Sequence, residues 1–392
     1  MAQLDIPAGK SEITRDWIAG ALQDSFPDMS EKLQSIELNE IGVGYGLMAS
    51  LYRCNLSYSE ELDYPQSVVL KMSSSDPASL KLAKSLDLYK REYDFYATMQ
   101  PIAKIRAPKL YHGAIDQPSN SFVLVLEDLR YMKAFNQLEG ASREQALAAV
   151  TAIGRLHGQF WNKKDAPSLS EAYQVITPIN AAVVHFIFRS NVDLAIQKFK
   201  QFFNSRLEQV VRTFGKRTTE LMIMSGSSDV TYIHGDYRLD NMFFGEEGEL
   251  AVLDWQVSGI SGGFFDVAYF LTGSLTPEIR RIVEREAIEK YCEVVSKESG
   301  IPLGFPEGWD FYRQGVLSCL LTAVIVSGGL DLSVDRSNDL VVAGLKRTLQ
   351  AIEELDADEF LDFRPSRFSA AVAVNGLINL AYGLSTLFRR AK

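Results

Sequence analysis

The sequence predicts an α+β protein in which a β-rich N-terminal part is followed by a mainly helical remainder. Short runs rich in β-branched and aromatic residues, separated by turn signals, occupy much of residues 36–129. After residue 142 the apolar residues recur with helical spacing over long stretches. One cluster of short β runs interrupts the helical part at 230–254, around the turn sequence GEEGE. These observations favour a small antiparallel sheet first and helices afterwards.

The elements of the N-terminal part are predicted from periodicity and from the residues that bound them. Trp17, Ile18 and Leu22 have the spacing of one helix face. In order, the expected elements are an opening helix at 14–25, two strands joined by a glycine-rich turn within 36–58, a strand at 67–72, a helix at 79–100, and two strands at 107–116 and 121–129.

The C-terminal part begins with a helical pattern at 142–162. The uncharged run 315–329 is short and predicts a core helix. A second uncharged run, 368–388, is flanked by arginines and is long enough to span a bilayer. Because Asn375 and Asn379 make it only mildly apolar, a packed terminal helix is favoured over membrane contact.

Length and pattern together predict two parts. At 392 residues the chain can form two domains or one two-lobed domain. The pattern changes after Leu129, so we predict an N-terminal part at 1–128 and a C-terminal part at 129–392, with a hinge in 126–135.

The composition limits the partners. The net charge of -10 gives no electrostatic support for nucleic-acid binding. The three cysteines are far apart without CxxC spacing, which fits a reducing compartment. The N-terminus lacks the pattern of a secretory signal. We therefore expect a cytoplasmic protein, for which cationic or neutral small molecules are acceptable partners; no oligomeric state is predicted.

The segment YIHGDYRLDNMFFGEEGELAVLDWQ, residues 232–256, carries the strongest chemical signal. Asp236 precedes Asn241 by five residues, and Asn241 precedes Asp254 by thirteen. A turn after the first strand and the following β-turn can direct all three side chains to one cleft. Asn241 and Asp254 supply the oxygen ligands that Mg²⁺ prefers. Asp236 can then orient a hydroxyl and accept its proton.

This segment resembles the H-x-D-x-x-x-x-N catalytic loop and following metal-binding Asp of kinase-like phosphotransferases. It is most similar to the aminoglycoside phosphotransferase and choline-kinase-like group, including its ecdysteroid-kinase-like branch. The form HGDYRLDN…LDW particularly resembles phosphotransferase domains found beside acyl-CoA dehydrogenases. The resemblance covers roughly residues 36–275 and implies a protein-kinase-like two-lobed fold that uses ATP and Mg²⁺.

The resemblance also implies partners elsewhere in the chain. Lys71, near the end of VVLKM, would hold the α- and β-phosphates, and Glu92 would pair with that lysine. His234 and Asp266 would support the catalytic loop. The backbone near Leu126, Glu127 and Asp128 would face the adenine, and a turn with Gly42, Gly44 and Gly46 would cover the phosphates. The G-x-G-x-G spacing of that turn departs from the protein-kinase G-x-G-x-x-G.

Two features point to a small-molecule substrate. Gly235 stands where protein kinases usually carry an arginine, and Asp266 follows Asp254 by only twelve positions, which leaves no room for an activation segment. Aromatic residues in the C-terminal part favour a partly apolar alcohol or a hydroxyacyl compound over a polycationic aminoglycoside; they are Phe186, Phe188, Trp309 and Tyr312.

The predicted reaction is therefore the ATP- and Mg²⁺-dependent phosphorylation of a hydroxyl group on a small molecule. Two alternatives are open. A non-catalytic nucleotide-binding protein of the same fold would keep these residues without turnover. A metal-dependent hydrolase would use His234, Asp236 and Asp254, but it leaves Lys71 and the glycine turn unexplained.

Overall fold

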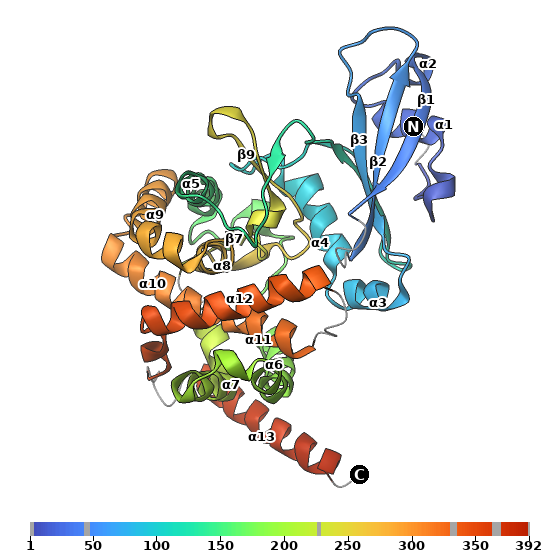
Figure 1. Ribbon diagram of the computed structural model, residues 1–392. Helices are drawn as coiled ribbons and strands as arrows, with labels where there is room; N and C mark the ends of the chain where they lie inside the picture. The colour runs from blue at the N-terminus through green and yellow to red at the C-terminus, as the bar shows by residue number, and fades with distance from the viewer. Residues whose placement is uncertain (1–3, 43–47, 226–228, 330–334, 363–369, 391–392) are drawn as a thin grey trace. The chain divides into compact units, whose positions relative to one another are not determined.

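In the computed structural model (Figure 1), the chain forms two compact units. The structure describes residues 4–42, 48–225, 229–329, 335–362 and 370–390. The first unit contains residues 1–133 and 242–258, and the second contains 134–241 and 259–392. The segment 242–258, which carries Asp254, thus belongs with the N-terminal sheet. The boundary at residue 128 stays a prediction.

The first unit is built on a five-stranded antiparallel sheet with the strand order β1-β2-β3-β5-β4 (Figure 1). All the strands predicted in the N-terminal part are present. Their bounds are β1 Leu33–Ile41, β2 Ala49–Tyr58, β3 Ser67–Ser73, β4 Leu110–Asp116 and β5 Ser121–Glu127.

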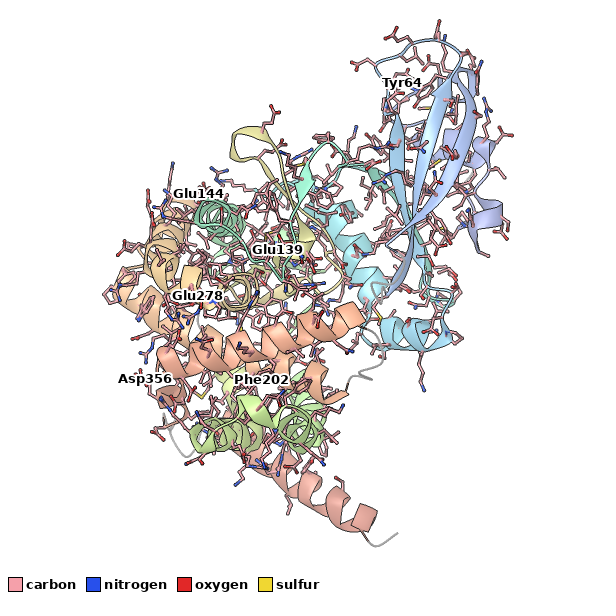
Figure 2. All side chains as sticks on the ribbon, in the orientation of Figure 1. Tyr64, Glu139, Glu144, Phe202, Glu278 and Asp356 are labelled. Atoms are coloured by element: carbon pink, nitrogen blue, oxygen red, sulfur yellow. The ribbon has the colours of Figure 1, made fainter. Side chains whose placement is uncertain are left out.

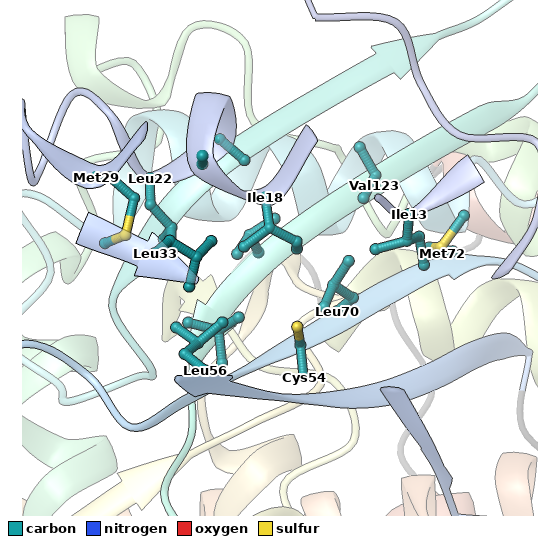
Figure 3. Close-up of a cluster of buried hydrophobic side chains, with 14 residues drawn as sticks. Ile13, Ile18, Leu22, Met29, Leu33, Cys54, Leu56, Leu70, Met72 and Val123 are labelled. Carbon is teal, nitrogen blue, oxygen red and sulfur yellow. The ribbon is translucent and has the colours of Figure 1, made fainter. Parts of the chain in front are cut away.

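One face of this sheet packs on the opening helices, α1 (Arg15–Leu22) and α2 (Met29–Lys32). The Thr14 hydroxyl caps α1 by accepting from the Trp17 N–H at 3.1 Å. Figure 3 shows Ile18 and Leu22 of α1 in the buried apolar cluster with Leu70 of β3. Since side chains alternate along a strand, Lys71 projects to the opposite face of the sheet.

The prediction of one continuous helix at 79–100 is wrong. It is divided into α3 (Pro77–Ser85), α4 (Leu88–Asp94) and a π-helical turn at Phe95–Met99 (η2). The interruption falls at Asp87, whose φ of 52° is left-handed and cannot continue a right-handed helix. A helical period survives such a break, so periodicity alone did not reveal it.

The second part of the first unit is a hairpin of β8 (Met242–Phe244) and β9 (Leu250–Val252). Its turn contains Gly248 with a φ of 81°, which glycine adopts without steric cost. The hairpin reverses the direction of the chain. Asp254 lies two residues after the end of β9. The short strand β6 (Lys133–Ala134) lies where the first segment of this unit ends.

The second unit is mainly helical, and its strands β7 (Val230–Ile233) and β10 (Gly259–Gly262) form an antiparallel pair. Its first helix begins with a capping box between Ser142 and Gln145. The helices are α5 Arg143–Phe160, α6 Pro178–Lys198, α7 Ser205–Ser225, α8 Phe264–Gly273, α9 Pro277–Ser299, α10 Phe305–Ser318, α11 Leu320–Gly329, α12 Asp335–Glu354 and α13 Ala370–Arg390. The run 315–329 falls in α10 and α11.

From residue 370 on, the uncharged C-terminal run lies in α13, which packs on α7 and α6 of its unit (Figure 1). The Asn375 and Asn379 side-chain amides both donate to the Lys216 carbonyl oxygen, at 3.0 and 2.7 Å. Arg189 of α6 donates to Asn379 Oδ1 at 2.8 Å. The residues that made this run only mildly apolar therefore attach the helix to its neighbours.

Within the described part of the chain, two helical segments are long and apolar enough to cross a membrane by length and composition, Pro178–Lys198 and Phe305–Gly329. Of their most apolar windows, 33% and 50% are buried within the protein. Core helices pass the same test, so these segments are weak evidence for a membrane. The cytoplasmic location stays a prediction.

Because of His185 of α6, we expect the free energy of unfolding to fall in acid. His185 is fully buried, its Nδ1 lies 3.2 Å from the Thr219 hydroxyl, and burial together with the charge of Arg189 lowers its pKa to about 4. The unfolded chain binds this proton near pH 6.5, so stability falls as the pH drops from there to about 4, by at most about 3 kcal/mol.

The matched variant is His185→Gln, which keeps a polar group for Thr219 and cannot titrate. Urea unfolding at several values of pH should give a shallower decline for the variant than for the wild type between pH 6.5 and 4. Parallel declines would show that another group causes the loss.

Candidate active site

Three of the predicted site residues lie together in the first unit. Lys71 Nζ is 2.8 Å from Glu92 Oε1 and 2.8 Å from Asp254 Oδ1. The Lys71 and Glu92 side chains are almost wholly buried, whereas a quarter of the Asp254 side chain is exposed. Residues 183 positions apart in sequence thus form one charged cluster with a partly accessible carboxylate.

The backbone of the first unit holds this cluster in place. Asp254 has a φ of 64°, a left-handed conformation that non-glycine residues adopt mainly where the surroundings enforce it. The next residue, Trp255, is fully buried and stacks on Phe95 with ring centroids 3.7 Å apart. Arg91, beside Glu92, donates to the Ser258 carbonyl oxygen at 2.9 and 3.0 Å. Sequence reasoning did not identify Arg91, Phe95 or Trp255 as supports.

The charges of the cluster are strongly coupled. Burial alone would lower the pKa of Lys71, but the carboxylates of Asp254 and Glu92 outweigh it and raise that pKa. Burial raises the pKa of Glu92 to about 7 despite the nearby ammonium group. We conclude that Lys71 remains a cation at neutral pH and that its removal leaves buried carboxyl groups without compensation.

The other predicted group lies in the second unit, in the loop after β7. Asp266 of α8 is fully buried and accepts from the backbone N–H groups of His234 at 2.6 Å and Gly235 at 2.8 Å. His234 Nδ1 accepts from the Asp236 N–H at 3.2 Å, so the imidazole orders the loop. Gly235 has a φ of 84°, a conformation unsuited to a side chain such as arginine.

A buried histidine contacts the Asp266 carboxylate. His157 of α5 has its Nε2 3.3 Å from Asp266 Oδ2 and its Nδ1 2.7 Å from the Tyr291 hydroxyl. His157 and His234 therefore both make contacts that support the loop.

Four side-chain contacts define the surroundings of Asp236. Arg238 Nε donates to its carboxylate at 3.0 Å, and Asn241 Nδ2 donates at 3.0 Å to both its carboxylate and its carbonyl oxygen. The Tyr269 hydroxyl also hydrogen-bonds to it, and burial followed by the charge of Asp236 raises the pKa of that phenol. Sequence reasoning missed Arg238 and Tyr269; the position of Arg238 within the motif was the available signal.

Only some of the residues predicted to contact the nucleotide lie within the described part of the chain. Gly42 has a φ of 73°, as expected at the start of a tight turn, whereas Gly44 and Gly46 lie outside the described residues. Glu127 already donates its N–H to the Lys109 carbonyl oxygen at 2.9 Å. An adenine would therefore have to use other backbone groups of Leu126–Asp128.

The Asp128 side chain has a local role. Its carboxylate accepts from Arg53 at 2.8 Å and from the Ser67 hydroxyl at 2.6 Å. Burial alone would raise its pKa, but these two hydrogen bonds and one from Arg130 lower it. The side chain thus joins the end of β5 to β2 and β3.

Two of the four aromatic residues used to infer the substrate are structural. Phe188 is fully buried against Phe214, with ring centroids 5.2 Å apart. Tyr312 is fully buried, and its hydroxyl donates to Glu284 at 3.0 Å. These two residues belong to the helical core and do not indicate what the protein binds.

Comparisons with known proteins agree with this fold. A model of the ecdysteroid kinase-like family matches residues 44–299. Choline kinase from Cryptosporidium parvum has a similar structure, with a TM-score of 0.56 at 15% identity over 88% of this chain and 97% of that one. A putative aminoglycoside phosphotransferase from Ralstonia eutropha gives a TM-score of 0.48 at 15% identity over 87% and 98%.

One curated relative is detected by sequence. Acyl-CoA dehydrogenase family member 10 of Mus musculus is 34% identical over 112 residues. The match covers 25% of this chain and 10% of the mouse protein, so the chain spans only a small part of that relative.

The fold is similar to that of choline kinase, a kinase-like phosphotransferase of small molecules. The family match covers well over half of the chain, and the chain belongs to the ecdysteroid kinase-like family. The resemblance and the protein-kinase-like fold expected from the sequence are thereby confirmed. Members of such families generally use a nucleoside phosphate with Mg²⁺.

Proposed function

We propose that the protein transfers the γ-phosphoryl group of Mg-ATP to a hydroxyl group of a small molecule. The observation that carries the proposal is the buried Lys71–Glu92 pair beside the partly exposed Asp254 carboxylate. Phosphoryl transfer depends mostly on positioning and charge stabilisation. A held cation next to an accessible carboxylate suits a triphosphate and its metal ion. A hydrolase of simple esters would not require this lysine.

Asp236 is the proposed general base. It orients the acceptor hydroxyl and takes its proton as the hydroxyl oxygen attacks the γ-phosphorus. A new oxygen–phosphorus bond forms, the bond between the γ-phosphorus and the bridging oxygen breaks, and ADP departs with that oxygen. Lys71 holds the α- and β-phosphates, and Glu92 keeps the lysine in position. His234 and Asp266 hold the loop that carries the base.

Asn241 and Asp254 are the proposed ligands of Mg²⁺. The Asn241 amide N–H donates to Asp236, which leaves the amide oxygen as a ligand, and Asp254 offers a partly exposed carboxylate. Among the described residues no three His, Cys, Asp or Glu side chains form a metal-binding group. Mg²⁺ does not need one, since it commonly uses one or two carboxylates with phosphates and water. The ion would neutralise charge on the phosphates.

The proposed substrate class is a partly apolar alcohol or a hydroxyacyl compound. The support comes from α6, where Ile179, Val183 and Ile187 are exposed. A polycationic aminoglycoside would need clustered carboxylates, and α6 carries a single one, Asp193. The hydroxyl of such a substrate would be the group that Asp236 deprotonates.

If Asp254 is a ligand of Mg²⁺, Asp254→Asn should change both the rate of ADP formation and its dependence on Mg²⁺. This variant keeps the size of the side chain but removes the charge that attracts Mg²⁺, so ADP formation should fall by at least ~10²-fold and require more Mg²⁺. The measurement is ADP release over a Mg²⁺ titration, with Mg-ATP affinity determined by calorimetry.

Asp193→Asn is the matched control, because Asp193 of α6 is exposed and pairs with Arg212 of α7. It should leave the Mg²⁺ dependence unchanged. Equal Mg²⁺ dependence in Asp254→Asn and the wild type would remove Asp254 from the metal site. Mg-ATP binding without turnover across alcohols would favour a non-catalytic nucleotide-binding protein.

A further inference from the structure

A buried arginine in the second unit connects two loops behind the proposed catalytic loop. Arg347 of α12 is 8% exposed. Its Nη1 donates to the Gln137 carbonyl oxygen at 3.0 Å and to the Gly273 carbonyl oxygen at 2.8 Å, and its Nη2 donates to the Leu138 carbonyl oxygen at 2.7 Å. One guanidinium therefore joins the loop before α5 to the end of α8. Figure 2 labels Glu139, which follows Leu138 in the first of these loops.

Each of these loops contacts the catalytic loop. The Gln137 N–H donates to Asp240 Oδ1 at 3.3 Å, and the Asp240 N–H donates to Gln137 Oε1 at 3.4 Å. On the other side, the Ser274 hydroxyl accepts from the Leu239 N–H at 2.9 Å. The 3₁₀ turn Leu239–Asn241 (η5) is thus held from both loops that Arg347 joins.

A second set of contacts leads from this turn to the proposed base. Arg238 Nη1 donates to Asp240 Oδ2 at 3.2 Å, while Arg238 Nε donates to Asp236 Oδ2 at 3.0 Å. Asp240 therefore fixes the side chain that contacts the Asp236 carboxylate. The hydrogen bonds run without a gap from Arg347 through Gln137, Asp240 and Arg238 to Asp236.

The chemistry of the guanidinium suits this task. Arginine presents several N–H donors in one rigid plane, whereas the lysine ammonium is a compact point charge on a flexible stem. Burial lowers the pKa of Arg347. The three hydrogen bonds to carbonyl oxygens offset the cost of burying the cation. Arginine therefore contributes the connection between the two loops.

We propose that Arg347 is a positioning residue for phosphoryl transfer, which sets the catalytic loop through Gln137 and Asp240 and thereby orients Asp236. The proposal rests on the proposed function, in which Asp236 is the base. Arg347 does not contact the reactants; it acts through Asp240 and Arg238. The rival view is that Arg347 serves only the packing of α12 against α8.

The first test needs no substrate. Arg347→Met removes the three hydrogen bonds and keeps an apolar side chain of similar length. Hydrogen exchange of peptides covering 237–241 should become at least ~10-fold faster in the variant, because Leu239 and Asp240 lose the support of both loops. Arg280→Met is the control: Arg280 is also buried in this unit but pairs with Glu284 and Glu354.

The second test is a double-mutant cycle with Arg238→Gln, measured as inorganic phosphate released from Mg-ATP with water as acceptor. Arg347→Met should lower kcat ~10–100-fold with little change in KM for Mg-ATP. If Arg347 acts through Arg238, the same change in the Arg238→Gln background should cost less than about 3-fold. Arg347→Lys should restore kcat at most in part, since its shorter side chain carries a single nitrogen, whereas Arg347 uses both Nη1 and Nη2.

Unchanged exchange at 237–241, or full additivity with Arg238→Gln, overturns the proposal. If Arg347→Met does not fold, Gln137→Ala replaces it, because this change removes only the side-chain contact with the Asp240 N–H and should reproduce the exchange and the non-additivity in part. A wild-type protein that neither binds Mg-ATP nor releases phosphate contradicts the proposed function instead, and the exchange experiment still decides whether Arg347 holds the loop.

Discussion

Replacing Asp236 with alanine lowers kcat by roughly 10²–10⁴-fold, the range for loss of a general acid–base group. The carboxylate is held by Arg238 and Asn241 at 3.0 Å, so its orientation is fixed before any substrate binds. Because the change affects proton transfer and not nucleotide binding, the affinity for Mg-ATP should stay near the wild-type value. Steady-state ADP formation and calorimetry with Mg-ATP provide the two measurements.

Asp236→Asn is the closer comparison, since it keeps the hydrogen-bonding shape and removes the basic group. It should be nearly as slow as the alanine variant. Asp193→Ala, on the surface of α6, serves as the control for general effects of losing a carboxylate. An undiminished rate in either Asp236 variant excludes it from the mechanism.

Replacing Lys71 with methionine should cost both activity and stability. The change leaves Glu92 buried without its cation, and breaking such a buried pair costs about 3–5 kcal/mol. It also removes the donor proposed for the α- and β-phosphates, so kcat should fall ~10²–10³-fold. These effects have one structural origin but can be separated.

The stability cost of Lys71→Met depends on pH. Burial already raises the pKa of Glu92 to about 7, and loss of the ammonium group raises it further. Since its folded-state pKa lies above the unfolded value near 4.3, the variant keeps its stability below that value and loses it as the pH rises toward and through 7. Urea unfolding at pH 5 and pH 8 measures the difference.

The double variant Lys71→Met with Glu92→Gln separates the two effects. Without the buried carboxylate, stability should recover most of the loss, whereas phosphoryl transfer should stay slow because no cation meets the phosphates. Recovery of both would show that Lys71 serves the fold alone. Recovery of neither would show that the loss arises outside the Lys71–Glu92 pair.

The sequence was informative where the chemistry is local. Strand alternation sends Lys71 to the face opposite the apolar cluster of Leu70, and the loop motif brings Asp236 and Asn241 together. The resemblance predicted the pairing of Lys71 with Glu92, which the first unit contains. These features depend on short spacings or on one strand, and such spacings are visible in a single sequence.

Contacts between distant segments were not predictable in this way. The break at Asp87 requires a left-handed residue that leaves the apolar period intact. Arg347 contacts Gln137, 210 positions away, and no local pattern marks a buried arginine. The burial of Phe188 and Tyr312 likewise depends on how helices pack, so aromatic composition was a poor guide to the substrate.

The most direct test of phosphoryl transfer follows the phosphate itself. The wild-type protein is incubated with Mg-ATP and a library of apolar alcohols, hydroxyacyl compounds and aminoglycosides, and ³¹P NMR monitors the products. The account predicts a new phosphate monoester of an alcohol, formed in step with ADP and absent with Asp236→Ala. Release of inorganic phosphate from esters without ATP, with no monoester formed from any alcohol, would contradict it.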